Sequence, residues 1–188
     1  MPHREFELLL AEHCAPTLLS HKCASLVTLS RRTFPDLSFL SDYSRTFLPH
    51  GISCRIICSC DKRALLLLYR REQLSMQLSK PGARRILSKL GYPADADPEA
   101  LLSRLEGRFL HSCGEFPHEI GLFLGYPAED VADFIRFGGR GERLCGYWKV
   151  YHDPESAKRK FTLYDRCRRY LCCSLQNGIP ISTLLFAA

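Results

Sequence analysis

Residues 116–127 hold the side chains best placed to do chemistry. Pro117 suits the first position of a short helix, so His118 and Glu119 are predicted to lie in its first turn. The positive end of the helix dipole favours a charged Glu119 carboxylate there and a neutral His118 imidazole. A neutral imidazole can accept a hydrogen bond or bind a metal ion.

Gly121 follows His118 by three residues and is expected on the same face of the helix, one turn later. A glycine inside a helix costs about 1 kcal/mol relative to alanine, so its presence needs a reason. The missing side chain could leave a notch where a ligand or metal lies against His118, or it could allow close helix packing. A metalloprotease motif is excluded, because no second histidine stands four residues after His118.

A lysine stands between two tyrosines in residues 145–151. Alternation along a strand places Tyr147, Lys149 and Tyr151 on one face, and Trp148 on the other. The lysine could hold an anion or let a base stack on its neighbours. It could equally be the solvent-facing lysine of a protected edge strand.

The ten cysteines among 188 residues fall below the roughly 8–10% that is typical of a disulfide scaffold. The first residues do not resemble a secretory signal, so a cytoplasmic protein with reduced thiols is expected. There is no C-x-x-C pair. Cys54 and Cys58 are predicted to share a strand face with Ile56, as small buried hydrophobic residues do. No metal site is expected, and the cofactor is unknown.

The hydrophobic pattern predicts an α+β fold. Residues 51–60 alternate, Asp61 and Lys62 form a turn, and residues 63–70 are apolar, which together indicate a β-hairpin. Residues 145–151 would add a third strand. We therefore expect a single domain over residues 1–188, in which several helices pack on one face of a small three-stranded antiparallel sheet.

Helix boundaries follow from capping residues. Asp97 and Asp153 each precede a Pro-Glu pair and are predicted N-caps, the second opening a helix over residues 154–176. Another helix should start near Pro16 and run to Lys22. Residues 86–93 and 122–127 share a helix end followed by Gly-Tyr-Pro, so one helix-turn-helix device is expected twice.

The net charge of +6 arises from 26 basic and 20 acidic side chains, and residues 136–169 account for all of it. Such a stretch could attract an acidic partner or nucleic acid, or be a solvated helix face. Binding to nucleic acid is not expected. The aromatic content of 11% excludes a disordered chain. No apolar stretch approaches the roughly 20 residues of a membrane-spanning helix.

Several of these blocks together resemble a bacterial family of unknown function, domain-of-unknown-function family 3793. The matching pieces extend over about residues 8–176: residues 13–18, Lys22, residues 69–70, residues 116–127, residues 129–131 and residues 146–151. The sequence departs from the family pattern at Ala132 and Asp133. The resemblance implies a cytoplasmic single-domain protein, and it implies no activity.

The family blocks bring together eight polar residues: Thr17, Lys22, Tyr69, Arg70, His118, Glu119, Lys149 and Tyr151. If they converge, they form a pocket for a small anionic or metal-containing ligand, and the protein is a ligand-binding or regulatory module. One alternative is an enzyme that uses His118 or Glu119 as a general base. Another is an interaction protein whose basic C-terminal helix docks on an acidic partner or nucleic acid.

Overall fold

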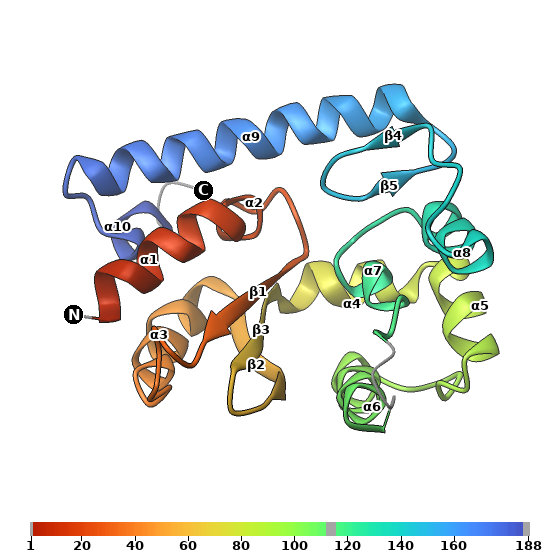
Figure 1. Cartoon of the computed structure of the whole chain (residues 1–188), viewed down its shortest axis with the longest axis horizontal. Helices are drawn as coiled ribbons and strands as arrows, with labels where there is room; N and C mark the ends of the chain where they lie inside the picture. Colours follow the sequence, from red (N-terminus) through yellow and green to blue (C-terminus); the bar gives the residue numbers. More distant parts are fainter. Residues whose placement is uncertain (1, 112–115, 186–188) are drawn as a thin grey trace. The chain divides into compact units, whose positions relative to one another are not determined.

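The computed structural model describes residues 2–111 and 116–185. Its chain divides into two compact units (Figure 1). We call them the sheet unit, Met1–Glu72 with Leu163–Ala188, and the helical unit, Gln73–Thr162. The expectation of one domain over the whole chain stays a prediction.

The sheet unit contains the three-stranded antiparallel sheet, and the α+β class is confirmed. Its strands are β1 (Ala24–Ser30), β2 (Ile52–Ser59) and β3 (Arg63–Arg70), in the order β1-β3-β2. The hairpin of β2 and β3 agrees with the sequence, but the predicted third strand was wrong. That strand is β1, whereas residues 145–151 belong to a separate small hairpin. The alternation of β1 is weak because it buries small residues, such as Ala24 and Ser25, on both faces.

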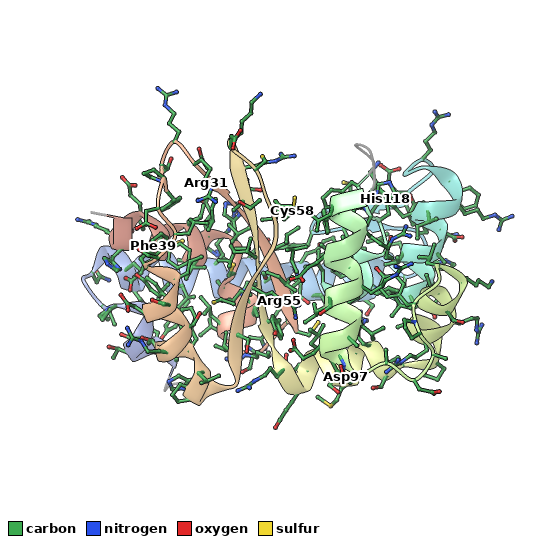
Figure 2. The ribbon with its side chains drawn as sticks, turned by 90° about the horizontal axis from the view of Figure 1, so that it is seen from below. Arg31, Phe39, Arg55, Cys58, Asp97 and His118 are labelled. Carbon is green, nitrogen blue, oxygen red and sulfur yellow. The ribbon has the colours of Figure 1, made fainter. Side chains whose placement is uncertain are left out.

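The predicted face of Cys58 was wrong, because β2 contains a β-bulge. Ile56 pairs with Leu66 and Cys58 with Leu65, so Ile57 is the extra residue between them. Since neighbouring residues of β3 point to opposite faces, Cys58 lies on the face opposite Ile56. Cys58 thus shares its face with Arg55 rather than with the isoleucine, and Figure 2 shows both residues along this strand.

The sheet unit also contains five short elements and the C-terminal part of the long helix α9 (Pro154–Gln176). The five are α1 (Pro2–His13), α2 (Ala15–Leu18), α3 (Leu40–Phe47), η1 (Leu48–His50) and α10 (Ile181–Leu184). One face of the sheet packs in a common core with them. Its members include Phe6, Leu10, Leu18, Phe47, Leu66, Leu68 and Leu184. The helix predicted from Pro16 to Lys22 ends already at Leu18. Residues 30–50 are rich in Ser, Pro and Arg, and this composition predicts a loop with room for one helical turn, whereas the eight-residue helix α3 forms there.

The helical unit contains most of α4 (Arg71–Ser79), then α5 (Pro81–Lys89), α6 (Pro98–His111), α7 (Ile120–Phe123) and α8 (Ala128–Phe137). The hairpin of β4 (Leu144–Cys145) and β5 (Lys149–Val150) follows, and α9 (Pro154–Gln176) runs on into the sheet unit. Both predicted N-caps are confirmed. Asp97 Oδ1 accepts from the Ala100 amide at 2.7 Å, and Asp153 Oδ1 from the Ser156 amide at 2.9 Å.

The two Gly-Tyr-Pro segments form the same helix cap. Gly91 and Gly125 have left-handed φ angles of 78° and 81°. The following amides donate to the carbonyl oxygen five residues back, Tyr92 to Leu87 at 3.0 Å and Tyr126 to Gly121 at 2.9 Å. This is the Schellman arrangement, in which glycine tolerates the left-handed turn. One copy joins α5 to α6, and the other joins α7 to α8.

Within the described residues, no helix is both long enough and apolar enough to cross a lipid bilayer.

Candidate ligand-binding site

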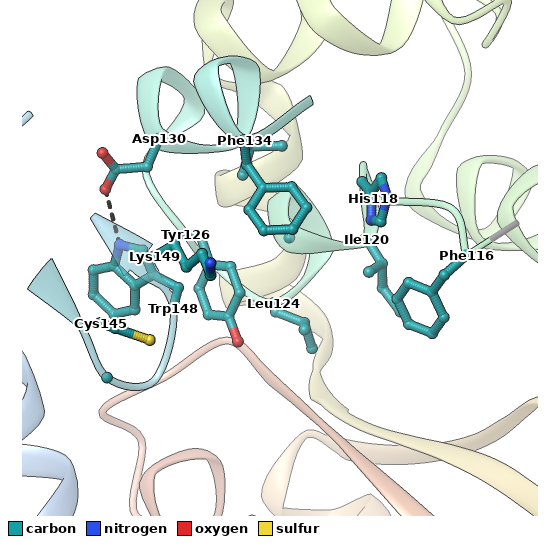
Figure 3. A pocket seen from close by; sticks show the side chains of 13 residues that line it. Phe116, His118, Ile120, Leu124, Tyr126, Asp130, Phe134, Cys145, Trp148 and Lys149 are labelled. Carbon is teal, nitrogen blue, oxygen red and sulfur yellow. Dashed lines mark hydrogen bonds between the residues drawn. The ribbon is translucent and has the colours of Figure 1, made fainter. Parts of the chain in front are cut away.

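A cavity of about 300 Å³ lies in the helical unit, between α7, α8 and the β4–β5 hairpin (Figure 3). Most of its lining is aromatic or aliphatic: Phe116, Ile120, Leu124, Tyr126, Val131, Phe134 and Trp148. The polar side chains in the lining are His118, Asp130, Cys145 and Lys149. The cavity thus combines an apolar body with a few polar groups, as small-molecule sites do.

Trp148 is the central wall of this cavity. Its indole stacks on Tyr126 with 5.2 Å between ring centroids and 25° between planes. The edge of Phe161 packs against it at 4.6 Å. Gly146 makes this packing possible, because a Cβ there would lie 2.3 Å from a Phe161 ring carbon. Only 7% of Trp148 is exposed, so its ring is a fixed surface.

Asp130, which the sequence analysis did not select, holds Trp148 in place. Its Oδ2 accepts a hydrogen bond from the indole Nε1 at 2.8 Å. Its Oδ1 accepts from the amides of Tyr151 and His152, at 2.8 and 3.1 Å. This buried carboxylate therefore ties α8 to the hairpin.

Close packing explains Gly121. A Cβ on this residue would lie 2.9 Å from Val131 Cγ2 and 3.1 Å from Tyr126 Cδ2. These two side chains occupy the space expected as a notch beside His118. The glycine thus lets α7 approach α8, and its backbone forms part of the cavity lining.

His118 lies at the cavity wall but not within a helix. The α-helix begins at Ile120 rather than at Pro117, because the first bonds are short-range turns, from the Ile120 amide to the Pro117 oxygen and from Gly121 to His118. The imidazole is exposed to solvent and meets the Phe134 ring edge-on at 4.9 Å. Figure 3 shows it beside Phe134, on the side of the cavity away from Cys145.

Glu119 is used in packing rather than in the cavity. Its carboxylate is buried, forms an ion pair with Arg108 and accepts a hydrogen bond from the Tyr92 hydroxyl at 3.0 Å. Burial and the Glu119 charge raise the pKa of Tyr92. The network joins α6, the first Gly-Tyr-Pro turn and the start of α7.

Lys149 lines the cavity and is held at two points. Its Nζ donates to the Gly139 carbonyl oxygen at 2.6 Å and lies 3.0 Å from a Glu142 carboxylate oxygen. The hydrogen bond to Glu142 raises the pKa of Lys149 and lowers that of Glu142. Tyr151 is buried and outside the cavity lining, and its hydroxyl has no hydrogen-bond partner within the described residues.

The other four predicted ligand-binding residues lie in the sheet unit, and two of them, Arg70 and Thr17, are hydrogen-bonded to each other. Arg70 donates from Nε to the Thr17 carbonyl oxygen at 2.7 Å, and its other nitrogens donate to the carbonyls of Leu18 and His50. It thereby fastens α2 and η1 to β3. The Thr17 hydroxyl bonds to that of Ser25 at 2.8 Å, and Tyr69 is buried in β3.

Lys22 is a buried lysine close to Cys14 and Cys23. Its exposed fraction is 9%. Burial lowers its pKa from 10.5 to about 8, and burial raises the pKa of Cys14 to about 12. Of the eight candidates, therefore, only His118 and Lys149 line the cavity. Thr17, Lys22, Tyr69 and Arg70 belong to the sheet unit, whereas Glu119 and Tyr151 lie in the helical unit outside the lining.

Replacing Lys22 with methionine should stabilise the protein at neutral pH by about 2 kcal/mol, because the folded state disfavours the charged amine. Below pH 8 the amine is charged in both the folded and the unfolded chain, so the free-energy cost of burying this charge is at its full size. The cost falls between pH 8 and 10.5, and above pH 10.5 it is zero because the amine is neutral in both states. The gain should therefore shrink as pH rises through this window. Urea unfolding at pH 7 and pH 10 measures it. The exposed Lys62→Met is the control, and an equal gain at both pH values would contradict the prediction.

The described residues contain no group of three or more His, Cys, Asp or Glu side chains that could hold a metal ion. Nine cysteines are free thiols, and the tenth, Cys113, lies outside the described residues.

Comparisons with curated proteins and with solved structures found no match. A family model described as "Protein of unknown function (DUF3793)" matches residues 10–185. This match covers nearly the whole chain. It includes the residues that line the cavity and the hydrogen bonds of Arg70 to α2 and η1. The resemblance found in the sequence is thereby confirmed, and the chain belongs to the DUF3793 family.

Proposed function

We propose that this protein is a small-molecule-binding or regulatory module whose ligand occupies the aromatic cavity of the helical unit. The observation that carries the proposal is the cavity of about 300 Å³ lined by Tyr126, Phe134 and Trp148. Its volume lies at the lower end of the range for small-ligand pockets. Rings and hydrocarbon side chains dominate the lining, which favours an organic ligand over the metal-containing one considered from the sequence.

Two of the predicted ligand-binding residues support this proposal from the cavity wall. Lys149 supplies a positively charged donor, and His118 supplies an imidazole that can donate or accept a hydrogen bond. Burial of a flat ligand against the rings would supply affinity at about 25 cal/mol per Å² of apolar surface. The few polar groups would set its orientation.

The alternative functions receive less support. Glu119 pairs with Arg108 in the packing of α6, so its carboxylate is not favoured as a general base. His118 lines the cavity, and an enzyme that uses this imidazole as a general base stays a prediction. On the basic helix α9, Lys158 and Arg168 pair with acids of the same helix. Docking of this helix on a partner stays a prediction, as does a cytoplasmic location.

Titration with N-phenyl-1-naphthylamine tests the proposal, because this uncharged dye brightens in apolar cavities and accepts energy from tryptophan. Trp148 is the only tryptophan of the chain, so energy transfer reports binding near the cavity. We expect saturable binding. Cys145→Phe places a ring at the exposed Cys145 position in the lining and should weaken binding at least about tenfold. Cys173→Phe is the matched control at an exposed cysteine outside the lining.

His118→Ala provides a second arm of this test. It should weaken dye binding severalfold and leave the urea midpoint unchanged, because the imidazole is exposed. Absent binding, or equal binding by Cys145→Phe and the wild type, would refute the proposed function.

A further inference from the structure

We infer that the ligand of this cavity is a planar, uncharged aromatic molecule that presents a carbonyl oxygen or a similar acceptor to the Lys149 ammonium. The inference rests on the proposed function and concerns the chemistry of the ligand. It replaces the anionic ligand expected from the sequence with an uncharged one.

The ring walls favour a planar ligand. Trp148 and Tyr126 are nearly parallel, with 25° between their planes, and Trp148 is fixed by Asp130 and Phe161. Rings of this kind bind other flat rings by offset stacking or edge contacts. Figure 3 shows Lys149 and Cys145 in the part of the cavity lined by Trp148, with Phe134 and His118 further along the lining.

Lys149 lines this space and keeps one N–H donor outside its two protein contacts. An ammonium group has three N–H donors. Two of them are directed to Gly139 and Glu142, at 2.6 and 3.0 Å. These contacts fix the position of Nζ, and the third donor has no acceptor within the described part of the chain. A donor that is already held in place needs little ordering when a ligand binds.

The charges around this donor select against an anion. Glu142 pairs with the Lys149 ammonium, and Asp130 adds a second carboxylate to the lining. The Asp130 oxygens are occupied by three N–H donors, so the residue remains an acidic neighbour and does not bind the ligand. A carboxylate or phosphate would lose its hydration next to a compensated lysine and two acids. A neutral acceptor takes the third donor without this penalty.

Three naphthalenes of nearly equal shape separate the possibilities. In 2-acetylnaphthalene the side group is a carbonyl, in 2-isopropenylnaphthalene a CH₂ replaces the carbonyl oxygen, and 2-naphthoate carries a carboxylate. Calorimetric titration of the full chain should show that the ketone binds about tenfold more tightly than the alkene, as expected for one hydrogen bond to a charged donor. The naphthoate should bind more weakly than the ketone.

Variants at the donor and its counter-ion complete the design. Lys149→Met should abolish the preference for the ketone over the alkene, whereas Lys149→Arg should keep most of it. Glu142→Gln should selectively strengthen naphthoate binding, because it removes one acidic neighbour. Thermal unfolding of each variant checks that it is folded.

The outcomes distinguish this inference from the proposed function. Equal binding of ketone and alkene, lost in Cys145→Phe, would overturn the inference and leave the proposed function standing. Tightest binding by the naphthoate would overturn it in favour of an anionic ligand. If none of the three binds and the dye does not bind either, both proposals fail.

Discussion

Asp130→Ala should destabilise the helical unit by about 3 to 4 kcal/mol. The substitution leaves three donors without their acceptor: the Trp148 indole and the amides of Tyr151 and His152. Each buried donor that loses its partner costs about 1 to 3 kcal/mol. The total stays near the lower end of the sum for three such donors, because the His152 amide is only partly buried. Trp148 emission during urea unfolding should show the loss as a lower midpoint with an unchanged slope.

Asp133→Ala is the matched control for this experiment. Asp133 lies one turn later on α8, where it bonds to the exposed His152 ring at 2.8 Å. Its loss should cost less than about 1 kcal/mol, as is usual for exposed pairs. Similar effects of the two substitutions would show that Asp130 is not the tie between α8 and the hairpin.

Gly121→Leu should destabilise the protein by about 3 kcal/mol and should also close the cavity. The Cβ alone would approach Val131 Cγ2 to 2.9 Å, so α7 must move away from α8 to admit a larger side chain. Overpacking of a buried contact has costs of this size. Urea unfolding measures the stability, and titration with N-phenyl-1-naphthylamine measures the loss of binding.

Replacing Gly107 with leucine, in contrast, should not destabilise the protein. Gly107 lies within α6, and a Cβ there would have no heavy atom within 4 Å. Gly107→Leu should leave stability unchanged or raise it by up to about 1 kcal/mol, because leucine favours a helix more than glycine does. A destabilisation equal to that of Gly121→Leu would mean that packing against Val131 is not the reason for the glycine.

The elements that the sequence predicted well depend on local signals. Asp97 and Asp153 accept from amides three residues away, and the β2–β3 hairpin needs only a short turn between two strands. Strand β1 was missed, because its place next to β3 depends on a partner about forty residues away. The bulge at Ile57 was missed as well, although the consecutive apolar residues Ile56 and Ile57 interrupt the alternation of this strand.

The candidate site was predicted in part for the same reason. His118 and Lys149 stand in segments whose residue types are unusual, and both line the cavity. Arg70 looked equally suited to an anion, yet its donors are taken up by carbonyls of α2 and η1, which only the folded chain reveals. Asp130 looked like an ordinary acid in the first turn of α8. Its three donors come from residues 148–152, and no short-range pattern links them to it.

The repeated Gly-Tyr-Pro cap gives two tyrosines the same backbone setting and different tasks. Tyr92 turns inward and bonds to Glu119, whereas Tyr126 stacks on Trp148 and faces the cavity. The same local cap therefore supplies one ring to the cavity lining and one to the packing of α6 and α7. A substitution at Tyr126 changes the cavity lining, while Tyr92 keeps its bond to Glu119 between α6 and α7. The shape and polarity of the cavity can thus be varied at one tyrosine without disturbing the network that holds α6.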